Sequence, residues 1–262
     1  MQQTKYLAAL FAAVFVLGAG LVFYATMSER TSSTDTTNTT DVSQENSIRG
    51  PGYTITNIPI PELEKLMPDL SRKVVFSDSV PLELRSQIEA KVKALAASLT
   101  EDPSRSEDWF NLAILYHIAN DYDGAKEIWE FLVRVAPQDT TAYDNLGKLY
   151  HFSLKDYPKA EQYFKQSISV NPNLLTPYHE LFDLYRYSYK TNTSAAIDIL
   201  NQAMERFPED VGLYVLLGEY HRDRGNVPAA REAYTKAVDL ARAVNDIVLV
   251  DAIGEELSRL PQ

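Results

Sequence analysis

The chain has 262 residues, a formal net charge of −11 and a pI of about 4.9. This acidic balance argues against nucleic-acid binding, which requires a basic face, and against electrostatic docking on anionic lipid. The sequence contains no cysteine, which excludes disulfides, thiolate chemistry and a lipidated N-terminal cysteine.

Residues 6–25 form an apolar stretch without a charged side chain. As a helix it would span about 30 Å, the thickness of one bilayer core. A cleaved signal peptide is the alternative, but its apolar region is usually about 7–15 residues long, and no clean cleavage site follows here. We therefore expect residues 1–27 to be a transmembrane anchor. The weak charge bias around it favours a cytoplasmic N-terminus and an extracytoplasmic domain.

Two segments of different composition follow the apolar stretch. Residues 28–50 are rich in Ser and Thr and have almost nothing to bury, which predicts a disordered tether. Residues 51–80 combine proline with many apolar side chains, so they are too apolar for a free linker and too broken for one long helix. We expect this irregular segment to pack along the outside or edge of the following array. A strap lying in the array's own groove is the alternative.

Residues 81–105 are expected to form a capping helix, a degenerate half repeat. Its apolar residues share one helical face, namely Leu84, Ile88, Val92, Leu95 and Leu99. Lys91 occupies the position where a complete repeat would place a small residue.

Residues 109–137 introduce a pattern that the chain then repeats. Four side chains fall at i, i+3, i+4 and i+7 of one helical face, namely Trp109, Leu112, Ala113 and Tyr116. A turn signal at 121–124 and a second periodic run follow, and Pro137 ends that run. This is a helical hairpin that cannot bury all of its apolar surface alone and therefore needs neighbours.

Three further copies follow at a spacing of about 34 residues. We place the units at 106–139, 140–174, 175–210 and 211–244. The second and third units are slightly longer than the others, and we expect their extra residues in the turn between the two helices. Residues 245–262 then predict a C-terminal capping helix, with a dimerising face as the alternative.

The four units resemble the tetratricopeptide repeat (TPR) family, whose pattern is W-x2-L-G-x2-Y…A-x3-F…P. Small residues at the close-packing positions are Ala125, Gly147, Ala160, Ala196, Gly218 and Ala230. Large residues that fill the gaps are Trp109, Trp129, Tyr150, Phe164 and Tyr234. The resemblance implies an all-α, TPR-type helical-hairpin solenoid whose concave groove binds peptides or helices. With the N-terminal transmembrane helix, the layout is similar to bacterial single-span TPR proteins of secretion or envelope assembly.

The resemblance also implies which residues line the groove, since TPR proteins use the face of each first helix that packing leaves free. The candidates are Phe110, Ile114, Asn145, Lys148, His151, His179, Arg186, Tyr187 and Arg222. The beginning of this face is apolar, and its middle predicts a grip on a peptide with acidic and aromatic side chains. The carboxylate clamp that holds chaperone C-termini is not expected, because only Asn145 agrees with it.

No motif predicts a catalytic, cofactor or metal site. His117 and His151 stand one period apart, but a metal site needs three or four ligands. No nucleophile elbow, P-loop or dinucleotide-binding pattern is present. We therefore expect a non-enzymatic scaffold, tethered to a membrane, that binds a protein partner, with oligomeric state open. The alternative is a structural subunit of a membrane complex whose groove is occupied by residues 51–80.

Overall fold

The computed structural model describes residues 49–50, 53–54 and 60–261, with side chains from residue 62 onward. The expected transmembrane anchor and nearly all of the expected tether lie outside the described residues. Among the helices that the structure describes, none is both long and apolar enough to cross a membrane. The described part is helical except for two paired two-residue strands, β1 (Arg49–Gly50) and β2 (Tyr53–Thr54).

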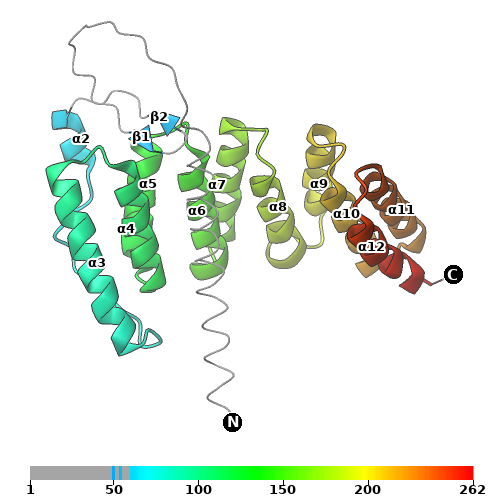
Figure 1. Ribbon diagram of the computed structural model, residues 1–262, viewed down its shortest axis with the longest axis horizontal. Coiled ribbons are helices and arrows are strands. Elements are labelled where there is room, and N and C mark those ends of the chain that lie inside the picture. Colours follow the sequence, from blue (N-terminus) through cyan, green and yellow to red (C-terminus); the bar gives the residue numbers. More distant parts are fainter. Residues whose placement is uncertain (1–48, 51–52, 55–59, 262) are drawn as a thin grey trace, which may run out of the picture. The chain divides into compact units, whose positions relative to one another are not determined.

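Helices from α3 onward follow one another in a row, each packing against its neighbours in the chain (Figure 1). Before the repeats lie α2 (Ile60–Leu66) and α3 (Leu82–Glu101). The hairpins are α4 (Ser106–Ile118) with α5 (Tyr122–Val135), α6 (Thr140–Lys148) with α7 (Tyr157–Val170), α8 (Thr176–Asp183) with α9 (Ala195–Arg206), and α10 (Val211–Asp223) with α11 (Val227–Ala243). The last helix is α12 (Ile247–Arg259). This is an all-helical, TPR-like solenoid.

The turns inside the hairpins use a recurring pair of residues. A residue with positive φ ends the first helix, and these residues are Asn120, Lys155, Lys190 and Gly225. In three of the four turns an Asp or Asn follows directly and caps the second helix; the Asp121 carboxylate, for example, accepts a hydrogen bond from the Gly124 N–H at 3.1 Å. A left-handed residue closes a helix and an Asx side chain opens the next, so the chain reverses within two residues.

The first helices of the second and third repeats end in π-helical turns, η1 (Leu149–Ser153) and η2 (Leu184–Ser188). In each turn a backbone N–H bonds five residues back, Leu154 to Leu149 at 2.9 Å and Tyr189 to Leu184 at 2.7 Å. We expected the extra length of these units in the loop. The structure corrects this: part of it widens the end of the first helix, where a π-helical turn accommodates one extra residue without breaking the helix.

In the second and fourth repeats, close packing within the hairpin requires a residue without a side chain at one position. A Cβ atom on Gly218 would lie 2.6 Å from the Tyr234 ring, and Gly147 faces Phe164 in the same way. Each pair sets a glycine of the first helix against an aromatic ring of the second, so a larger residue there would push the helices apart.

The buried apolar residues form two clusters. The first runs from Leu63 to Tyr220 and holds α3 and the first three repeats together. The second contains α11 and α12 side chains, including Tyr234 and Ile253, and supports the C-terminal cap. Helix α10 joins the two clusters, because Leu213 and Tyr220 belong to the first and Tyr214 and Val215 pack against the second.

Residues 69–80 attach to the first repeat through polar contacts. The Arg72 guanidinium donates to both carboxylate oxygens of Asp121 at 2.6 and 2.8 Å, and the Val75 N–H donates to the same carboxylate at 2.8 Å. The Tyr116 hydroxyl donates to the Arg72 carbonyl at 3.0 Å. These contacts place the segment at the α4–α5 turn, at the edge of the repeat.

Candidate functional site

The candidate site is a strip of side chains on the first helices of the repeats, which we call the first-helix face. It contains the nine predicted groove residues, Phe152, and the acidic side chains beside them, which are Asp144, Glu180, Asp183, Glu219 and Asp223. In the first repeat it is apolar: Phe110 and Ile114 are both partly buried, and Phe110 packs against the main core. Asn145 follows on α6 and is also partly buried.

Ion pairs join the first-helix face from one repeat to the next. Lys148 on α6 lies 3.2 Å from Glu180 on α8. Arg186 on η2 pairs with Glu219 at 3.3 Å and with Asp223, both on α10. These contacts form a ladder in which each cation is bound to the repeat that follows.

The ladder continues into the C-terminal cap. Arg222 on α10 pairs with Glu256 on α12 at 2.8 Å and with Asp223 at 3.2 Å. The three Lys and Arg side chains among the predicted groove residues, Lys148, Arg186 and Arg222, therefore already have carboxylate partners. Sequence analysis missed these partners, although opposite charges about one repeat apart would have indicated them.

Arg186 is the most enclosed of these cations, with a side chain only 8% exposed. Its guanidinium carbon lies 5.5 Å from the centre of the Phe182 ring and 4.8 Å from that of Tyr187. Held by two carboxylates and two rings, Arg186 acts as a fixed support for Tyr187 rather than as a free cation.

His151 links two repeats from a buried position. Its Nε2 atom lies 2.9 Å from the Ser188 hydroxyl, and its ring stacks on Phe152 with 4.0 Å between ring centres. Burial lowers the pKa of His151, so the neutral ring is favoured at neutral pH. The structure therefore places this predicted groove residue inside the junction between η1 and η2.

Two large aromatic side chains remain exposed on this face. Phe152 is 55% exposed and Tyr187 is 63% exposed. They occupy the same place in consecutive π-helical turns, directly after His151 and Arg186. The repeat register and the π-helical widening together put two aromatic side chains on neighbouring helix ends.

Two carboxyl groups of the first-helix face lack a cationic partner among the described residues. Asp144 is buried, its Oδ1 has no hydrogen-bond partner, and burial raises its pKa to about 6. Asp183 forms no ion pair with another described residue, and burial likewise raises the pKa of its carboxyl, with Glu180 contributing. Because Lys148, Arg186 and Arg222 are all paired, the charged groups of this face that have no ion-pair partner among the described residues are these two carboxyl groups.

A cavity of about 370 Å³ opens beside Asp183; we call it the α8–α10–α12 cavity. Its lining comprises His179, Asp183, Val211, Gly212, Val215, Leu216 and Leu249. The polar groups come from α8, and the other walls are apolar. The Nε2 atom of His179 is buried without a hydrogen-bond partner among the described residues.

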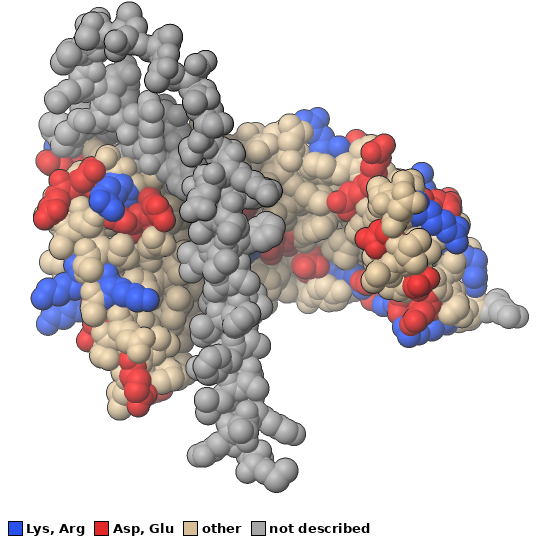
Figure 2. All heavy atoms as spheres, viewed as in Figure 1, with Lys and Arg blue, Asp and Glu red and all other residues tan. Residues whose placement is uncertain are grey.

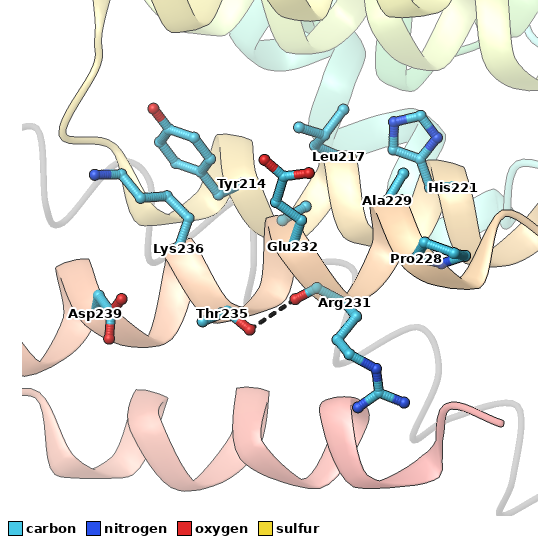
Figure 3. Close-up of a pocket in the computed structure, with 11 residues that line it drawn as sticks. Tyr214, Leu217, His221, Pro228, Ala229, Arg231, Glu232, Thr235, Lys236 and Asp239 are labelled. Carbon is cyan, nitrogen blue, oxygen red and sulfur yellow. Dashed lines mark hydrogen bonds between the residues drawn. The ribbon is translucent and has the colours of Figure 1, made fainter. Parts of the chain in front are cut away.

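A second cleft, of about 740 Å³, lies between α10 and α11 (Figure 3). Tyr214, Leu217 and His221 line it from α10, and they occupy packing positions of the repeat pattern. The equivalent residues of the second repeat, Tyr143 and Leu146, are buried, whereas Tyr214 and Leu217 are partly exposed. The cleft is thus an incompletely covered packing face of the fourth repeat.

Charges of both signs are interspersed over the surface of the C-terminal helices in the view of Figure 2. Within the described residues, no three His, Asp or Glu side chains come together in a way that could hold a metal ion.

Two sequence profiles described as "Tetratricopeptide repeat" match the chain, over residues 140–174 and 185–244. No curated protein sequence matches it. Solved structures that match this chain include MamA, 19% identical, covering 66% of this chain and 99% of that chain with a TM-score of 0.49. Another is YrrB, described as a TPR protein with an unusual peptide-binding site (18% identity, 65% and 87% coverage, TM-score 0.44). A third is BtubC (BKLC) from P. vanneervenii, which is 16% identical and covers 68% of this chain and 91% of that chain with a TM-score of 0.48. The profiles show that the chain contains tetratricopeptide repeats.

Proposed function

We propose that this protein is a membrane-tethered scaffold that binds a protein partner through its first-helix face. The observation that carries the proposal is the exposure of Phe152 and Tyr187 at equivalent places on neighbouring repeats. Exposed aromatic residues are common anchors of protein interfaces, because they bury a large area with few rotatable bonds.

The surroundings of these two side chains also suit a binding role. Tyr187 rests on the Arg186 guanidinium, which two carboxylates of α10 hold, and Phe152 stacks on the buried His151. Side chains already held in place lose little conformational freedom when a partner binds. π-helical turns are also frequent at functional sites.

The tether and the location of the domain belong to the same proposal. Residues 6–25 supply the membrane anchor and residues 28–50 the flexible connection, on composition alone. The N-terminus then lies in the cytoplasm and the repeats lie outside it, in a process such as envelope assembly or secretion. Carbonate extraction of membranes tests this part: the full chain should stay in the pellet, whereas release into the supernatant would contradict the anchor.

The test of the binding face is in-cell photocrosslinking with a photoreactive residue at position 187. We expect capture of a defined protein partner, which the double variant Phe152→Ala/Tyr187→Ala should lose. Position 248 is a matched control, because Val248 is exposed but lies in the C-terminal cap. Equal capture from both positions, or none from position 187, would refute the binding face.

A second candidate is a structural subunit whose first-helix face is covered by its own residues 51–80. Residues 72–75 are bound to Asp121 and Tyr116 at the edge of the first repeat, so in this candidate the residues before them would have to extend from that edge over the face. Crosslinks from position 187 that reach only residues 51–80 of the same chain would support this candidate over a scaffold with a free face.

A further inference from the structure

The α8–α10–α12 cavity combines an apolar interior with polar groups on one wall. Val215 and Leu216 of α10 and Leu249 of α12 supply apolar surface, and His179 and Asp183 stand on α8. Its volume of about 370 Å³ falls in the range of roughly 300–1,000 Å³ typical of ligand sites. The cavity can therefore receive a side chain and not only solvent.

The charges around the cavity select the kind of side chain that can enter. Asp183 faces Glu180, Glu219, His179 and Arg186. Glu180 is bound to Lys148, and Arg186 is bound to Glu219 and Asp223. Asp183 is thus the carboxylate at the cavity wall to which no described cation is paired.

We propose that the α8–α10–α12 cavity binds an apolar side chain of a protein segment, and that a neighbouring lysine or arginine of this segment pairs with Asp183. This inference rests on the proposed function and specifies the chemistry of the partner. It replaces the acidic ligand expected from the sequence, because Lys148, Arg186 and Arg222 are already engaged.

His179 lines the cavity beside Asp183, although its Nε2 atom is itself enclosed. Apolar contact in the cavity and a cation on Asp183 therefore hold the segment at two points on α8.

Two short synthetic peptides serve as probes for binding to the full chain in detergent micelles by fluorescence polarisation. One has a central phenylalanine flanked by lysines, and the other has the same phenylalanine flanked by glutamates. We expect the lysine peptide to bind and the glutamate peptide not to bind. Replacing the central phenylalanine by alanine should also abolish binding, which separates cavity binding from general attraction to an acidic protein.

Two variants test the cavity itself. Asp183→Asn removes the charge with little change of shape and should weaken the lysine peptide about tenfold or more. Val215→Phe fills the cavity and should weaken it similarly, provided that circular dichroism shows an intact fold. Asp251→Asn is the matched control, since Asp251 is exposed on α12 outside the cavity lining, and it should leave binding unchanged.

Failure of this inference differs from failure of the proposed function. If position 187 captures a partner, and Asp183→Asn changes neither that capture nor peptide binding, the scaffold function stands and the cavity assignment is wrong. Equal binding of the two peptides, or binding of neither, also refutes the cavity assignment. Absence of any partner at position 187 refutes the scaffold function instead.

Discussion

The first and second repeats differ from the fourth in how completely neighbouring elements cover them, although all follow one pattern. At equivalent positions Leu146 is fully buried, whereas Leu217 borders an open cleft. The first repeat is also bound by residues 69–80 through Asp121, and the fourth is linked to α12 mainly by apolar contacts and the Arg222–Glu256 pair. The repeat pattern therefore determines where the helices form, whereas the packing of neighbouring elements determines how completely each helix is buried.

The pair Leu146→Ala and Leu217→Ala tests this difference most strongly. Leu146→Ala should lower the free energy of unfolding by about 2–5 kcal/mol, because it leaves a cavity in a closed core. Leu217→Ala should cost about 1 kcal/mol, because part of its surface is already exposed. Denaturant unfolding followed by circular dichroism measures both values. Equal losses would show that the cleft at the fourth repeat does not weaken packing.

Arg72→Ala should detach residues 69–80 from the first repeat. It leaves the carboxylate of Asp121 buried without its guanidinium, and we expect a loss of about 2–3 kcal/mol, reduced somewhat because Arg72 is partly exposed. Limited proteolysis should then cleave the segment at 69–80. Lys126→Ala is the control, since the Lys126–Asp123 pair is at the surface and should cost under about 1 kcal/mol. Similar losses for both variants would rule out a special role for the Arg72 contact.

Asp144→Asn should stabilise the protein in a pH-dependent manner. The folded-state pKa of Asp144, about 6, lies above the ordinary value of 3.8, so ionisation destabilises the fold as the pH rises through this window. The variant should gain up to about 2–3 kcal/mol at pH 7 and nothing near pH 4. Asp251→Asn is the exposed control. A gain that is the same at both pH values would contradict burial as the cause.

Glu256→Gln should have the smallest effect on stability. Arg222 and Glu256 are both about one-third exposed, so their ion pair contributes under about 1 kcal/mol. Thermal unfolding in low and high salt measures this contribution, which added salt should remove. A large loss would mean that the ion pair, and not apolar packing, holds α12 on the fourth repeat.

The prediction of an all-helical, TPR-like solenoid is confirmed, and the profiles match tetratricopeptide repeats over residues 140–174 and 185–244. The sequence could indicate this fold because side-chain spacing and turn residues are local signals. The positions of Gly147 and Gly218 opposite aromatic rings also follow from the pattern. The membrane anchor at 1–27 stays a prediction, as do the nine groove residues. The pairing of Arg186 with Glu219 was signalled only by opposite charges about one repeat apart, and the burial of His151 does not follow from the pattern of any single helix.

The amino-acid sequence by itself determined the helices, their hairpins and the repeat spacing, because a helical face and a capped turn depend on residues only a few positions apart. The tertiary structure decided which charges remain unpaired, which packing faces stay open and where residues 69–80 bind. These features depend on distances between side chains about one repeat or more apart in the chain, and such distances exist only once the repeats have packed.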